Sequence, residues 1–190
     1  MDPLTAHSRA QVAFGQVLAS VMPTQYGGPT PCEEWTVADL IDHVVGGNHR
    51  VAAAVTTGEV PAAAAQDTAG SSPGRVVDLF RSSAERAEEA FAGPGALTRT
   101  IEWPVGPLPG AVLIGMRTTD VLVHAWDLAV ATGQPTDLDP ELSEACLATA
   151  RERIRPSMRG PGRFFGPERR CPPGRSAADR LAAFMGRLVS

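Results

Sequence analysis

Lysine is absent from this 190-residue sequence, so all 17 of its basic residues are arginine. No apolar run approaches the roughly 18–20 residues of a membrane-spanning helix, and we therefore expect no membrane association. The first residues hold no basic segment followed by an apolar stretch, which predicts a cytoplasmic protein without a secretory signal. With a formal net charge of −4, the chain is not expected to bind nucleic acid through a broad basic face.

Cysteine is scarce as well. Cys32, Cys146 and Cys171 are odd in number and widely spaced, and no pair of them forms a CxxC motif. Neither a disulfide framework nor a cysteine-based zinc site is therefore expected. The simplest interpretation is three free thiols in a reducing compartment.

Helical periodicity, interrupted by proline and glycine, dominates what is present. We expect helices over residues 4–22, 36–57, 75–91, 111–132 and 139–155, and a short one after residue 176. Residues 60–74 are predicted to form a loop, and 98–110 an ordered loop with room for one short strand. Without a βαβ pattern or an internal repeat, the fold class is all-α, a four-helix bundle with additional short C-terminal helices.

The length fits one domain. We expect it to span residues 1–190, with a bundle core over about 4–155 and a C-terminal extension over about 156–190. Thr36 and Asp39 have the spacing of a capping box, which predicts a helix beginning there. Gly133 is typical of the position just after a helix.

The helix over 111–132 carries an acid and a histidine on one face. Each residue turns a helix by about 100°, so Asp120 and His124 lie one turn apart and about 40° from each other. Leu113, Met116 and Ala131 share that face, which predicts that it points into the core. Because a buried, unpaired carboxylate costs several kcal/mol, something must compensate it, and a metal ion would do so directly.

A third ligand has to come from another helix, and His43 is the candidate. It lies at the edge of the apolar stripe formed by Leu40, Val44 and Val51. Gly47, one turn later, has no side chain and is predicted to leave room beside the histidine. Spacing alone leaves a second interpretation open, since a D-x-x-x-H pair also forms ordinary helical ion pairs and a core histidine is usually just hydrogen-bonded.

Other polar residues are weaker candidates. Asp127 has two interpretations, orienting a metal ligand from behind or pairing with an arginine. Asp39 is already explained as a cap. His7, near the terminus and with no evident partner, and His49, expected in solvent, are not predicted ligands. Arginines that could hold an acidic substrate are otherwise expected to be solvated, and the tryptophans are interpreted as packing residues: Arg50, Arg75, Arg117, Trp35, Trp103, Trp126.

Two segments, 30–43 and 119–133, resemble the actinobacterial branch of the DinB-like superfamily, and 164–168 and 179–184 are similar to it as well. This branch contains the metal-binding domain of mycothiol-dependent maleylpyruvate isomerase. The resemblance implies a four-helix bundle with a metal ion, often zinc, near one end. Its ligands would be His43, Asp120 and His124.

The resemblance also implies a function, a metal-dependent transferase or isomerase in which a small thiol such as mycothiol attacks an electrophilic substrate. Nickel, iron or manganese would also suit histidine and carboxylate ligands. Two alternatives stay open, a non-catalytic module stabilised by the metal, including as a homodimer, and a metal-dependent hydrolase. The isomerase has glutamate where this chain has the shorter Asp120, and a second domain that we do not expect here.

Overall fold

The computed structural model describes residues 1–62, 68–160 and 165–189. The α-helices there are α1 (Pro3–Leu18), α2 (Val37–Thr57), α3 (Pro73–Ala92), α4 (Gly110–Thr132), α5 (Pro140–Arg153) and α6 (Ala177–Phe184). A hairpin of two short antiparallel strands, β1 (Thr100–Ile101) and β2 (Leu108–Pro109), precedes α4. The predicted all-α fold is confirmed. Residues 63–67 of the predicted loop and Phe164 of the resembling segment lie outside the described residues.

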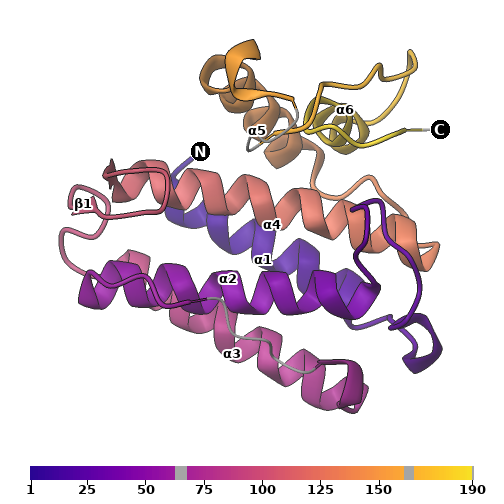
Figure 1. Ribbon diagram of the computed structural model, residues 1–190, viewed down its shortest axis with the longest axis horizontal. Coiled ribbons are helices and arrows are strands. Elements are labelled where there is room, and N and C mark those ends of the chain that lie inside the picture. The colour runs from indigo at the N-terminus through magenta and orange to yellow at the C-terminus, as the bar shows by residue number, and fades with distance from the viewer. Residues whose placement is uncertain (63–67, 161–164, 190) are drawn as a thin grey trace.

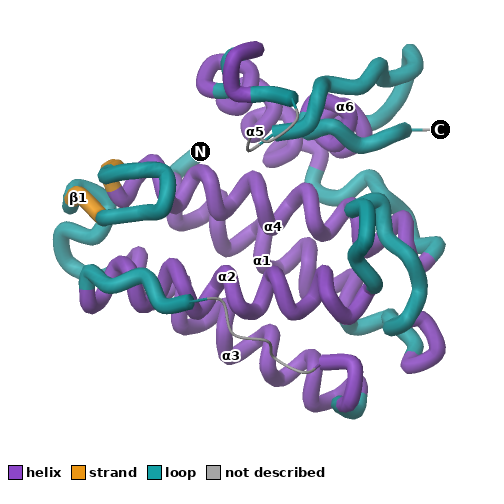
Figure 2. The backbone as a smooth tube through the Cα atoms, viewed as in Figure 1, coloured by secondary structure: helices purple, strands orange, loops and turns teal. Residues whose placement is uncertain are grey.

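Four helices form the bundle, and two shorter ones cover one side of it. Helix α1 packs along α4 and α2 along α3, while α5 and α6 pair with each other beside α4 (Figure 1). The tube view separates the two ends of the bundle: the hairpin lies at one end, and the long connector between α1 and α2 at the other (Figure 2). That connector leads into the start of α2, which carries His43, and its Cys32 contacts His124 of α4.

Helix ends follow the signals in the sequence. Thr36 Oγ1 accepts a hydrogen bond from the Asp39 amide (3.2 Å), and the Asp39 carboxylate accepts one from the Thr36 amide (2.9 Å). This capping box satisfies free amides at the start of α2 and sets its first turn. Gly133 ends α4 with φ +70°, a left-handed conformation that favours glycine.

The main core lies between α1, α2 and α4. Phe14, Leu40 and Ile41 are completely or almost completely buried, and Phe14 packs against Phe80 of α3 with ring centroids 4.9 Å apart. Burying a side chain of this size contributes about 1.5–3 kcal/mol, so these contacts hold α2 against its neighbours. No helix in the described part of the chain is long and apolar enough to cross a membrane.

One expectation about α4 is wrong. Met116, predicted on a core-facing stripe with Asp120, is 39% exposed, so this stripe lies at the edge of the bundle. The pattern misleads because α4 is covered by α1 and α2 on one side and by α5 and α6 on another. Consecutive residues such as Val121, Leu122 and Val123 are all buried, and a helix that is apolar all round does not single out one inward face.

Candidate metal centre

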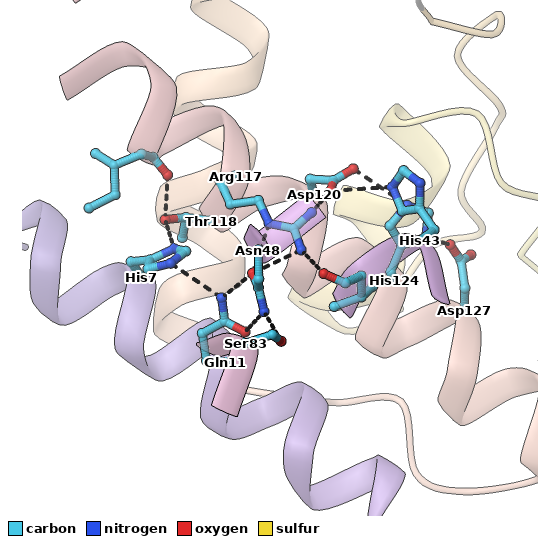
Figure 3. A network of polar contacts seen from close by, with 12 residues as sticks. His7, Gln11, His43, Asn48, Ser83, Arg117, Thr118, Asp120, His124 and Asp127 are labelled. Carbon is cyan, nitrogen blue, oxygen red and sulfur yellow. Dashed lines mark hydrogen bonds and ion pairs between the residues drawn. The ribbon is translucent and has the colours of Figure 1, made fainter. Parts of the chain in front are cut away.

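The three predicted ligands come together between α2 and α4. His43 Nε2 lies 3.6 Å from Asp120 Oδ2, and His124 Nε2 lies 3.4 Å from Asp120 Oδ1 (Figure 3). One ligand atom from each residue lies within 4.8 Å of the other two. Two ligands about 2.0–2.1 Å from a tetrahedral zinc ion are roughly 3.3–3.4 Å apart, so these separations suit a shared ion. We call these three residues the triad.

The triad is closed on one side and open on the other. The His124 side chain is 8% exposed, whereas those of His43 and Asp120 are each 39% exposed. Trp35 lies against both imidazoles, tilted to His43 with ring centroids 4.8 Å apart and stacked on His124 with ring centroids 5.7 Å apart. Trp35 was predicted to be a packing residue; it packs against both imidazoles and so forms one wall of the centre.

Behind His124 lies a buried ion pair. Asp127 is fully buried, and its Oδ2 lies 3.0 Å from His124 Nδ1 and 2.8 Å from Arg187 Nη2. A histidine that donates from Nδ1 keeps the lone pair of Nε2 free, and Nε2 is the atom that faces Asp120. The two interpretations of Asp127 are therefore both met: it contacts the candidate ligand His124 from behind, and it pairs with an arginine, Arg187.

Cys32 also belongs to this region, although sequence spacing did not indicate it. Its Sγ donates to Asp127 Oδ2 (3.2 Å) and lies 3.9 Å from His124 Nδ1. Arg187 Nη2 donates to the same sulfur (3.4 Å). Cys32 and Arg187 are 155 residues apart in the chain, so no local pattern could bring them together. The three cysteines are free, as predicted.

A buried arginine supports Asp120 from the other side. Arg117 Nη1 donates to Asp120 Oδ2 (2.5 Å), and its Nη2 donates to the Val44 carbonyl. A Cβ added to Gly47 would lie 2.7 Å from Arg117 Cζ, far inside normal contact. The room beside His43 predicted from Gly47 is thus filled by a guanidinium, and the expectation of a solvated Arg117 is wrong.

Arg117 continues into a closed set of buried polar residues that we call the inner network. Asn48 Oδ1 accepts from Arg117 Nε (3.1 Å) and from Gln11 Nε2 (2.9 Å), and Asn48 Nδ2 donates to Ser83 Oγ (3.1 Å). Besides Arg117, its members come from all four helices of the bundle: His7 and Gln11 from α1, Asn48 from α2, Ser83 from α3 and Thr118 from α4.

His7 is therefore not the partnerless terminal residue that we expected. It is 1% exposed, with Gln11 Nε2 3.2 Å from its Nε2 and Thr118 Oγ1 3.4 Å from its Nδ1. Burial, helped by the charge of Arg117, lowers the pKa of His7 to about 3. The sequence near the chain start gave no sign of this burial, because Gln11 is one turn along α1 but Thr118 is 111 residues away on α4.

Charges within the triad reinforce one another. Burial disfavours both charged forms, but attraction between Asp120 and His124, with their mutual hydrogen bond, outweighs it. The pKa of Asp120 is consequently well below its usual range, with His43 and Arg117 contributing, and the pKa of His124 is well above its usual range. Without an ion the pair behaves as the helical ion pair that the spacing also allowed.

The remaining candidates lie elsewhere. Asp39 serves only as the cap of α2, and Trp126 packs while its Nε1 donates to Asp179 (2.8 Å). Arg75 is exposed near the start of α3, as expected. Arg50 is half-buried against Trp103, so the expectation of a solvated side chain is wrong there.

Residues 7–129 match the family described as the mycothiol maleylpyruvate isomerase N-terminal domain. The chain belongs to this family. The predicted resemblance is thus confirmed, and the matched range contains His43, Asp120 and His124. Helices α5 and α6, with Arg187, lie outside it.

Similar proteins agree with this membership. The uncharacterized proteins MT0763 and Rv0738, from Mycobacterium tuberculosis strains CDC 1551 / Oshkosh and ATCC 25618 / H37Rv, are each 53% identical over 190 residues, covering 100% of both chains. The crystal structure of the mycothiol-dependent maleylpyruvate isomerase superposes with a TM-score of 0.63 at 21% identity. A histidine-to-alanine mutant of that enzyme gives 0.59. The alignment covers 77% of this chain and 66% of the isomerase chain. At 21% identity this likeness establishes the fold alone.

Proposed function

We propose that this protein binds one divalent metal ion, zinc as first candidate, through the triad and uses it to activate a small thiol such as mycothiol. The activated thiol would attack an electrophilic substrate in a transfer or isomerisation. The observation that carries the proposal is the convergence of three ligand atoms within 4.8 Å beside an open face. Membership in the isomerase family supports the choice of thiol.

Neighbouring residues hold His124 and Asp120 in position for this task. His124 offers Nε2 because Asp127 holds its Nδ1, and Asp120 keeps Oδ1 turned toward His124 while Arg117 holds Oδ2. Two neutral imidazoles and one carboxylate leave a divalent ion with a net charge near +1. Zinc in such a site, when bound, makes a coordinated thiol easier to deprotonate. Trp35 keeps water from one side of the imidazoles.

The open face favours this function over a purely structural metal. A structural zinc site is closed by four protein ligands, and Cys32 is the nearest candidate for a fourth. Its sulfur lies at the Nδ1 edge of His124 and bonds to Asp127, whereas the triad uses the Nε2 edge. Cys32 therefore does not complete the triad in this arrangement. An open position is also what a metal-dependent hydrolase would need, so the thiol has to be tested directly.

Calorimetric titration of the metal-free protein with zinc tests the metal site. We expect one ion per chain, and His124→Ala should weaken binding by at least about a hundredfold, more than loss of an outer partner costs. His49→Ala, which removes a half-buried histidine outside the triad, should bind zinc normally. Unchanged binding by His124→Ala would contradict the assignment.

Titration of mycothiol into the zinc-loaded protein then tests the thiol. Heat should appear with the zinc-loaded protein and vanish after chelation or in His124→Ala. If the loaded protein gives no heat with the thiol, the thiol-dependent function is wrong even though the metal site stands. If chelation instead unfolds the chain, the ion has a structural role.

A further inference from the structure

A pocket lies between α2 and α3, and no triad residue lines it. Its volume is about 770 Å³, within the roughly 300–1,000 Å³ typical of small-molecule pockets. Its lining is mostly small residues, among them Ala53 and Ala90, together with three basic side chains and one acid: His49, Arg50, Arg86 and Glu89. Such a mixture, an apolar surface with a few converging polar groups, is characteristic of ligand sites.

Arg50 is the most informative of these residues. Its guanidinium lies 5.5 Å from the centroid of the Trp103 ring, a cation–π contact that fixes its position. Its Nε is buried, yet has no hydrogen-bond partner among the described residues. A buried donor without an acceptor is uncommon and costs free energy. Because Nε itself is closed to solvent, a ligand would meet the outer nitrogens of this guanidinium, which lines the pocket.

Arg86 adds a second cation on the facing helix. Glu89 follows it by three residues, but in the described part of the chain neither Arg50 nor Arg86 forms an ion pair with a carboxylate. Arginines that hold the fold together are different, since Arg187 is paired with Asp127. The guanidinium groups at this pocket are therefore free to bind an anion.

Histidine chemistry fits the same picture. Burial, with the nearby charge of Arg86, lowers the pKa of His49, so its imidazole is neutral around pH 7 and offers one donor and one acceptor. Two arginines against Glu89 leave the lining with one net positive charge. A ligand with a single negative charge matches that balance better than a doubly charged phosphate.

We infer that this pocket binds a small monocarboxylate with a compact apolar body, its carboxylate between Arg50 and Arg86 and its apolar part on the alanines. Guanidinium groups hold carboxylates through paired, charge-assisted hydrogen bonds. The site is separate from the triad: Arg50 follows His43 by seven residues, about 10 Å along α2, and no triad residue lines the pocket. The inference does not depend on the proposed thiol chemistry.

Calorimetric titration with phenylacetate, and with phenylacetamide as its uncharged counterpart, tests this site in the full-length protein. Phenylacetate should bind saturably to one site per chain, and phenylacetamide at least about tenfold more weakly, as loss of a charge-assisted contact predicts. Arg50→Gln and Arg86→Gln should each weaken phenylacetate by about tenfold or more. Thermal melts would confirm that both variants fold.

Two controls make the result decisive. Arg75→Gln, which changes an exposed arginine of α3 outside the pocket, should leave phenylacetate binding unchanged. His124→Ala should also bind phenylacetate normally, which separates this site from the triad. The inference is overturned if the wild type shows no saturable binding, if both probes bind equally, or if Arg50→Gln and Arg86→Gln bind like the wild type.

Discussion

Two groups of polar residues meet at Asp120, the inner network on one side and the triad on the other (Figure 3). In the inner network Asn48 and Gln11 exchange hydrogen bonds of 2.9 and 3.2 Å, and none of its buried side-chain atoms is without a partner. In the triad the facing atoms are 3.4 and 3.6 Å apart beside an open face. The closed inner network has no free polar atom for a ligand, and its task is to orient Asp120 through Arg117. The triad, with longer separations and an open face, has room for an ion.

The largest expected effect comes from breaking the inner network at Arg117. Arg117→Met should destabilise the metal-free protein by about 3–5 kcal/mol, because it removes the hydrogen bonds of a buried charged group to Asn48 and to the Val44 carbonyl, each worth about 1.5–3 kcal/mol. Asn48 Oδ1 would keep Gln11 as its donor but lose Arg117, the Val44 carbonyl would lose one donor, and Asp120 its buried cation. Urea denaturation measures this, with Arg75→Met as the exposed control. A loss below about 1 kcal/mol would show that the network is not structural.

The second largest expected effect is a loss of folding stability at acidic pH, caused by His7 of the inner network. This histidine is neutral in the folded protein, with a pKa of about 3, but takes up a proton below about 6.5 when unfolded. The unfolded state therefore binds more protons between these values, and the stability contributed by His7 is lost as the pH falls through that window. From pH 7 to pH 4.5 the loss should be about 2–3 kcal/mol.

His7→Gln isolates this term, because glutamine keeps hydrogen-bonding capacity without titrating. Denaturation curves at several pH values should show a smaller decline in stability for His7→Gln than for the wild type. Parallel curves for the two proteins would mean that His7 titrates normally in the fold.

The smallest expected effect concerns the triad and is a change in its zinc affinity. Asp127→Asn should weaken zinc binding by about 10–100-fold, the usual range for an outer partner of a metal-bound histidine. The amide no longer holds the His124 Nδ1 proton by charge, and Arg187 loses its ion pair. Competition with a chromogenic chelator measures the affinity, with Asp78→Asn on the exposed face of α3 as control. Equal affinity in the two variants would leave Asp127 no role in the site.

Much of the fold was predictable because its signals are local. Thr36 with Asp39 starts α2, and Gly133 ends α4, each through contacts within a few residues. The pairing of Asp120 with His124 is equally local, since one helical turn brings them together. His43 was within reach because an apolar stripe on α2 indicated which of its faces borders the core.

What escaped prediction depends on contacts between distant segments. Arg117 meets Asn48 across 69 residues, and Arg187 meets Asp127 across 60. Neither contact leaves a pattern in the sequence around it, and arginines are solvated in most proteins. Cys32 was missed for the same reason, because it reaches His124 from a connector that has no periodicity of its own.

Gly47 restricts which residues can replace it in related sequences. The guanidinium of Arg117 occupies the volume that any larger residue at position 47 would need. A larger side chain at position 47 is tolerated only where the one at position 117 has become shorter. In relatives of this family, a larger residue at position 47 should therefore be absent wherever position 117 is arginine, whereas glycine at 47 is compatible with other residues at 117.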